Sequence, residues 1–109
     1  MSDEKTQTYD NGMIGQYVLV RCRDAGVHAG RLVSHIGRQC VLEASRRLWY
    51  WRPANGAAFL SGVATEGLDH ADSKVGAEVK RLHLTENCEI ALCTERAAES
   101  IAGAPAFKP

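Results

Sequence analysis

The stretch E-A-S-R-R-L-W-Y-W-R, residues 43 to 52, holds the most unusual combination of side chains in the chain. Both tryptophans and one of the three tyrosines occupy consecutive positions, 49 to 51, and arginines flank them at positions 46, 47 and 52. A short run rich in aromatic residues is typical of a β-strand. Aromatic rings beside guanidinium groups can also stack on flat molecules and bind anions. The stretch therefore predicts a strand and is our first candidate for a binding surface.

Strand alternation divides the aromatic residues of this stretch between two faces. Trp49 and Trp51 would face one way, and Tyr50 and Arg52 the other. We expect the tryptophan face to meet the core, because one face of the strand must be buried. The opposite face, with one of the two preceding arginines, would then be open to a ligand. The alternative is a purely structural strand with one buried tryptophan and solvated basic residues.

Further strands are expected on both sides of this one. Runs of strand composition and strand length occupy residues 17–22, 27–36, 39–43, 48–52, 79–84 and 88–93. Turn-forming residues separate these runs. Gly30, inside the second run, indicates a bend or a close approach of another backbone. Short strands joined by short turns predict an antiparallel sheet that bends into a small barrel or sandwich.

Two helices are predicted in the second half of the chain. Residues 57–64 form a short amphipathic segment, which Gly62 weakens by about 1 kcal/mol. The second helix begins after Thr94, an N-cap residue, and ends at Gly103. Residues 67–76 are expected to form a loop. These elements indicate an α+β fold: a small, strongly bent antiparallel sheet or partial barrel with a short central helix and a C-terminal helix.

Length and composition indicate one domain. The chain has 109 residues, of which 45% are hydrophobic and 24% charged, as in ordinary globular proteins. The polar residues 1–15 predict a flexible N-terminal tail, so the globular domain should span 16–109. We expect no membrane-spanning helix, because no apolar run reaches about 18 residues. The N-terminus lacks the hydrophobic stretch of a secretory signal, which favours the cytoplasm.

Charge argues against nucleic acid as the partner. The formal net charge is zero, so no overall field attracts nucleic acid or an anionic membrane. Residues 43–52 have the aromatic and basic ingredients of a small nucleic-acid binder, but the chain has no extended basic tract for a phosphate backbone. A compact anionic ligand needs only two or three arginines and one aromatic surface. We therefore expect a small anionic ligand.

The sequence contains no motif of a known catalytic or metal site. No histidine neighbours a serine or cysteine in a nucleophile pattern, and phosphate-loop, zinc-protease and dinucleotide fingerprints are absent. His70 and Asp72 could ligate a metal, but without a second matched cluster a solvated loop is favoured. We expect no enzymatic activity, no cofactor and no metal. We also expect four reduced thiols, at Cys22, Cys40, Cys88 and Cys93.

His28 lies between two glycines, Gly26 and Gly30, whose missing side chains allow a ligand or another backbone to approach. One interpretation is a surface histidine at the start of a strand. The other is a hydrogen-bond donor beside a pocket, assisted by Arg21 and Arg23.

Several of these motifs occur together in a known group of proteins. They are V-R at 20–21, A-G-V-H-A-G-R-L at 25–32, R-R-L-W-Y-W at 46–51, L-T-E-N-C-E-I at 84–90 and C-T-E-R-A-A-E-S-I at 93–101. In these motifs the chain resembles a family of small proteins of unassigned function encoded by tailed bacteriophages and prophages. The resemblance covers residues 16–107 and departs in the polar N-terminus and in the segment 67–76. It implies a phage origin and the cytoplasm of an infected bacterium, and it implies no catalytic residues.

The expected function is that of a phage accessory binding protein that counters host defence. We expect it to sequester a nucleotide-derived immune signalling molecule without enzymatic chemistry. The alternatives are an inhibitor of a host defence protein and a small single-stranded nucleic-acid-binding protein. Self-association is expected, because a domain of this size has a limited core. The candidate ligand-binding residues are Arg46, Arg47, Trp49, Tyr50, Arg52, His28 and Arg21.

Overall fold

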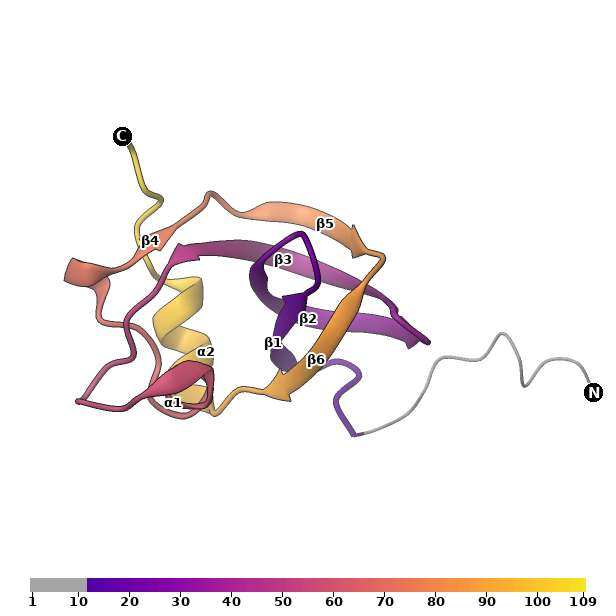
Figure 1. The fold of residues 1–109 in the computed structure, drawn as a ribbon, viewed down its shortest axis with the longest axis horizontal. Helices are drawn as coiled ribbons and strands as arrows, with labels where there is room; N and C mark the ends of the chain where they lie inside the picture. Colours follow the sequence, from indigo (N-terminus) through magenta and orange to yellow (C-terminus); the bar gives the residue numbers. More distant parts are fainter. Residues whose placement is uncertain (1–11) are drawn as a thin grey trace, which may run out of the picture.

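The computed structural model describes residues 12–109 and has the predicted α+β fold (Figure 1). Its elements are β1 Tyr17–Cys22, β2 Val27–Ile36, β3 Gln39–Tyr50, α1 Phe59–Glu66, the short 3-10 helix η2 His70–Asp72, β4 Lys74–Val75, β5 Val79–Leu84, β6 Asn87–Leu92 and α2 Glu95–Ala102. The six antiparallel strands belong to one sheet that does not close.

Most predicted elements are confirmed, and two predictions are wrong. The strands expected at 39–43 and 48–52 are one continuous strand, β3. The loop expected at 67–76 contains η2 and the two-residue strand β4. Residues 1–11 of the expected tail lie outside the described residues. The rest of that tail is packed, because Met13 and Ile14 contact a hydrophobic core.

The long strand β3 organises the sheet. One edge of β3 pairs with β2 along its length, and the other edge pairs first with β5 and then with β4. Beyond β2 follow β1 and β6. The strands β5 and β6 follow one another in the chain but lie at opposite edges of the sheet. The sheet therefore has to bend strongly to bring these two edges near each other (Figure 1).

A bulge in β3 reverses the faces that its side chains occupy. Ala29 pairs with Arg46 and Arg31 with Glu43, so two steps along β2 match three steps along β3. The additional residue is accommodated at Ala44, whose backbone is in the left-handed region with φ 52°. Because alternation has a period of two, one additional residue turns the rest of the strand over. The two halves of β3 thus serve different cores.

The first core lies between the sheet and the two helices. It contains Leu19, Ala29, Leu48, Val63, Ala64, Leu68, Val75, Ile101 and Ala104. The second core is enclosed by strands of the bent sheet. It contains Val18, Val20, Cys22, Leu32, Cys40, Leu42 and Leu84. β1 contributes to both cores, which explains why its apolar run is nearly continuous.

Gly30 lies where the bulge approaches β2. A Cβ atom on Gly30 would be 2.9 Å from the carbonyl oxygen of Glu43 and 3.1 Å from the Cα atom of Ser45. The predicted close approach of another backbone is therefore confirmed, and any side chain at this position would displace β3.

The helices are joined through the N-cap of α2. The hydroxyl of Thr94 accepts a hydrogen bond from the Ala97 amide at 3.1 Å, which confirms the predicted cap. The same hydroxyl donates to the carbonyl of Thr65 at 2.7 Å. The cap thus fixes the start of α2 against the last turn of α1.

The guanidinium of Arg46 holds the other end of α2. Arg46 is 4% exposed, so the expectation that it could lie on the surface is wrong. It donates to the carbonyls of Gly76 (2.7 Å), Ile101 (3.2 Å), Ala102 (3.0 Å) and Ala104 (2.8 Å). Carbonyls at a helix C-terminus lack intrahelical partners and carry partial negative charge. A buried arginine is therefore satisfied here without a carboxylate.

Gly30→Ala should destabilise the fold, because the added methyl group meets backbone atoms that cannot move independently. We expect a loss of about 1–3 kcal/mol in the free energy of unfolding, measured by urea denaturation. Gly76→Ala is the matched control, since a Cβ there would meet its nearest atom at 3.5 Å. Equal effects of the two substitutions would contradict the close approach at Gly30.

Arg46→Met should destabilise the protein by about 3–5 kcal/mol, since four carbonyls lose their donor in a buried environment. Arg46→Lys should recover only part of the loss, because an ammonium cannot reproduce the planar fork of a guanidinium. Thermal and urea unfolding measure both. The neighbouring, exposed Arg47→Ala should change stability by less than about 0.5 kcal/mol. A stable Arg46→Met protein would show that the guanidinium contacts are dispensable.

Candidate ligand-binding site

Two surface pockets lie side by side at the end of β3. The first has a volume of about 360 Å³ and is lined by Arg47, Trp49, Lys74, Val75, Gly76 and Phe107. The second has a volume of about 410 Å³, and its lining includes Tyr50, His70, Asp72, Ser73, Lys74, Phe107 and Lys108. Lys74 and Phe107 line both pockets and form the wall between them.

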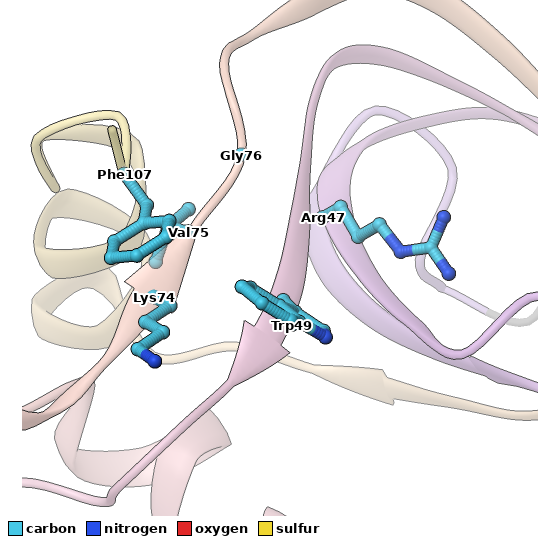
Figure 2. Close-up of a pocket in the computed structure, with 6 residues that line it drawn as sticks. All are labelled: Arg47, Trp49, Lys74, Val75, Gly76 and Phe107. Atoms are coloured by element: carbon cyan, nitrogen blue, oxygen red, sulfur yellow. The ribbon is translucent and has the colours of Figure 1, made fainter. Parts of the chain in front are cut away.

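Two aromatic rings hold a lysine ammonium at this wall. The ring centroids of Trp49 and Phe107 are 5.7 Å apart, with the planes inclined by 60°. The Lys74 Nζ lies 5.2 Å from the Trp49 centroid and 5.0 Å from the Phe107 centroid. Figure 2 shows the three side chains together, whereas Arg47 extends away from Phe107. The site therefore presents a cation whose position is restricted by the rings.

Trp49 faces solvent because the preceding residue, Leu48, occupies the core side of β3, and alternation turns the next side chain the other way. The edge of β3 is irregular beyond Leu48. Leu48 pairs with Val75 and Tyr50 with Lys74, so two steps on β3 match a single step on β4. The indole of Trp49 is 66% exposed, and the prediction that it belongs to the core is wrong. Trp51, beyond the end of the strand, is partly buried and packs against the first core, as expected.

The chain after α2 brings Phe107 to the site. Ala106 forms a parallel bridge with Val75, and the Phe107 amide donates to the Val75 carbonyl at 2.8 Å. The bond from Arg46 to the Ala104 carbonyl fixes the start of this segment. A residue near the C-terminus thereby faces a tryptophan from the middle of the chain.

The charges of the pockets favour an anion. Arg47, Lys74 and Lys108 are exposed cations of the lining. Among the described residues that line the two pockets, Asp72 is the one acidic side chain. Arg52, a predicted site residue, lies beside the second pocket with its Nε 4.0 Å from Asp72 Oδ2. Its charge partly neutralises that carboxylate.

Four predicted site residues are absent from the lining of the two pockets: Arg52, beside the second pocket, and three that lie elsewhere. Arg46 is the buried clamp described above. Arg21 donates through Nε to Glu89 at 2.7 Å, on the β1–β6 side of the sheet. His28 is 5% exposed, so it is not a surface histidine, and its Nε2 donates to the Ala25 carbonyl at 2.9 Å. The aromatic–arginine stretch thus contributes Arg47, Trp49 and Tyr50 to the lining, while Arg52 stands at its border.

Several lining residues had no signal in the sequence that linked them to Trp49. Lys74 and Gly76 lay in a segment interpreted as a loop, and Phe107 lay after the last predicted helix. Their contacts with β3 depend on long-range pairing. The sequence offered one signal, the aromatic Phe107 beside Lys108. Local patterns alone cannot assign Phe107 to a partner.

Two of the four cysteines are protonated because they are buried. The four cysteines are free thiols, and burial raises the pKa of Cys93 to about 12 and that of Cys40 to about 11. At neutral pH these two groups are thiols rather than nucleophilic thiolates. Across residues 12–109 there is no cluster of three or more His, Cys, Asp or Glu side chains suited to a metal ion. In the same residues no helix has the length and apolar character needed to cross a membrane.

The structure is thus a small α+β domain with two adjoining surface pockets. Residues 15–101 match the model of a protein family described as Domain of unknown function (DUF6948), and the chain belongs to this family. The match agrees in extent with the resemblance found at residues 16–107, whose phage origin stays a prediction. No curated protein and no solved structure matches the chain. Phe107 lies beyond the matched residues, whereas the other residues that line the first pocket lie within them.

The buried His28 should make stability depend on pH. Burial lowers its pKa below the usual 6.5, the charge of Arg47 adds to the effect, and the hydrogen bond to Ala25 opposes it. Nδ1 has no partner among the described residues, so a proton there would be buried without an acceptor. The unfolded chain therefore binds this proton more readily than the folded protein does.

We expect the free energy of unfolding to fall as the pH drops through about 6.5, and the loss to level off below the folded-state pKa. In His28→Gln this component should disappear. Urea unfolding of both proteins between about pH 7.5 and 5.5 measures the difference. Identical pH profiles would mean that His28 is not the responsible group.

Proposed function

We propose that this protein is a non-enzymatic binding protein whose ligand is a compact, anionic, nucleotide-like molecule. The observation that carries the proposal is the Lys74 ammonium, held between the exposed rings of Trp49 and Phe107 at the junction of two pockets. A positioned cation next to flat aromatic surfaces matches the two chemical parts of a nucleotide, a phosphate and a base.

The expected energies are sufficient for specific binding. Stacking of a base on an aromatic ring contributes about 1–3 kcal/mol. A hydrogen bond between an ammonium and a phosphate contributes about 1.5–3 kcal/mol. Lys74 already lies against the rings, so its side chain loses less conformational entropy when a phosphate binds than a freely rotating lysine would lose. Arg47 extends away from Phe107 and is expected to contribute less than Lys74.

The biological role that we propose is sequestration. In the cytoplasm of an infected bacterium, a phage accessory protein with this site would remove a nucleotide-derived immune signal from solution and so counter host defence. This part of the proposal rests on the resemblance to phage-encoded proteins. It includes self-association of the chain, which the limited core of a domain of this size favours.

A second candidate is an inhibitor that binds a host defence protein. It is favoured by the aromatic side chain of Phe59, which is 80% exposed, because aromatic residues are enriched in protein interfaces. Nucleic-acid binding is a weaker third candidate, because the net charge of zero provides no field for a phosphate backbone. Phe59 does not line either pocket, so the first two candidates predict effects at different residues.

Trp49→Ala and Lys74→Ala should each weaken nucleotide binding by about tenfold or more while leaving the fold intact, because both side chains are exposed. Isothermal titration with AMP, GMP, ADP-ribose and cyclic dinucleotides measures the affinities, and thermal melts check the fold. Phe59→Ala and Arg38→Ala are matched controls for an exposed ring and an exposed cation elsewhere, and they should bind normally. If no nucleotide of the panel binds at millimolar concentration, or if the two controls weaken binding as much, the proposed function is wrong.

A further inference from the structure

We infer that the site is bipartite and that its ligand is a dinucleotide, in which two bases are joined by a phosphate-containing link. The inference rests on the proposed function and specifies the class of nucleotide. It follows from the arrangement of the two pockets, which are neighbours with a common wall of Lys74 and Phe107.

Each pocket has its own aromatic side chain. Trp49 lines the first pocket and Tyr50 the second. These residues are adjacent in β3, and Tyr50 is the direct pairing partner of Lys74. The indole and the 55% exposed phenol therefore lie near the same lysine but serve different pockets. A ligand with rings on both sides of a central anion would contact both aromatics at once.

The volumes fit one ring system in each pocket. Sites for small molecules have volumes of about 300–1,000 Å³, and the two pockets, at about 360 and 410 Å³, are both near the lower limit. A mononucleotide would fill one of them and leave the other to water. A dinucleotide could occupy both without any change in the backbone.

The distribution of charge determines where the phosphate would lie. The second pocket contains the carboxylate of Asp72, which repels phosphate but can accept hydrogen bonds from a base amino group or a ribose hydroxyl. The hydroxyl of Ser73 is also in this pocket and accepts from the Arg52 amide at 3.0 Å. Lys74 at the common wall is the cation that both pockets share. The linking phosphate is therefore placed at Lys74, and the bases lie to either side.

Titration of the full chain with mononucleotides and linear dinucleotides tests the inference. The ligands are AMP, GMP, linear di-adenylate and linear di-guanylate. At least one dinucleotide should bind about tenfold or more tightly than its mononucleotide, because a second ring adds a stacking contact. Tyr50→Ala should remove this advantage, so that in this variant the dinucleotide and its mononucleotide bind with affinities within about twofold of each other. Tyr50→Phe, which keeps the ring, should retain the advantage.

The possible failures are distinguishable. If mononucleotides bind as tightly as dinucleotides, the bipartite site is wrong and the proposed function stands. If dinucleotides bind more tightly but Tyr50→Ala keeps the full advantage, the second ring lies elsewhere and the inference is also wrong. If neither class binds, the bipartite site and the proposed function fall together.

Discussion

The buried guanidinium of Arg46 connects the sheet with the end of α2 and with the segment before β5. It extends from β3 to carbonyls in both places. An arginine in such a place has to be fully hydrogen-bonded, because an unsatisfied buried charge is very costly. The C-terminal chain therefore has a defined start at Ala104, and its path along β4 brings Phe107 opposite Trp49.

Two irregularities in β3 decide which side chains this frame exposes. The bulge at Ala44 moves the strand from the second core to the first, which is why Arg46 points toward α2. The bulge also puts Leu48 in the first core, so alternation turns the side chain of Trp49 toward solvent. The shift beside Leu48 then interrupts the alternation, and Tyr50 is exposed as well. Gly30 is required by the first irregularity, since only a residue without a side chain fits against it. A structural requirement of the sheet thus produces an exposed aromatic surface.

Local patterns in the sequence were enough to predict the fold class, but only part of the site. The strand at 17–22 and the Thr94 cap depend on neighbouring residues, and both are confirmed. The close approach at Gly30 is also confirmed, because a glycine inside a strand signals it even though the approaching backbone belongs to β3. The orientation of Trp49 was predicted wrongly because Trp49 and Trp51 were assigned to one buried face, whereas Leu48 occupies the core position and β3 ends at Tyr50. The bulge that sets this register has no local signature, because its extra residue is an alanine. Lys74 and Phe107 could not be assigned to the site, since both reach it through β4, a strand too short to recognise from the sequence.

In the proposed site the outward-facing ring of Trp49, and not that of Trp51, meets the ligand. The chain has only these two tryptophans, so a proton–nitrogen correlation spectrum of the labelled protein contains two indole signals, which a Trp49→Phe variant assigns. Addition of a nucleotide that binds in titration should shift the Trp49 signal strongly and leave the Trp51 signal nearly unchanged. A shift of the Trp51 signal alone, or no shift of either signal at saturating nucleotide, would contradict the assignment of the site.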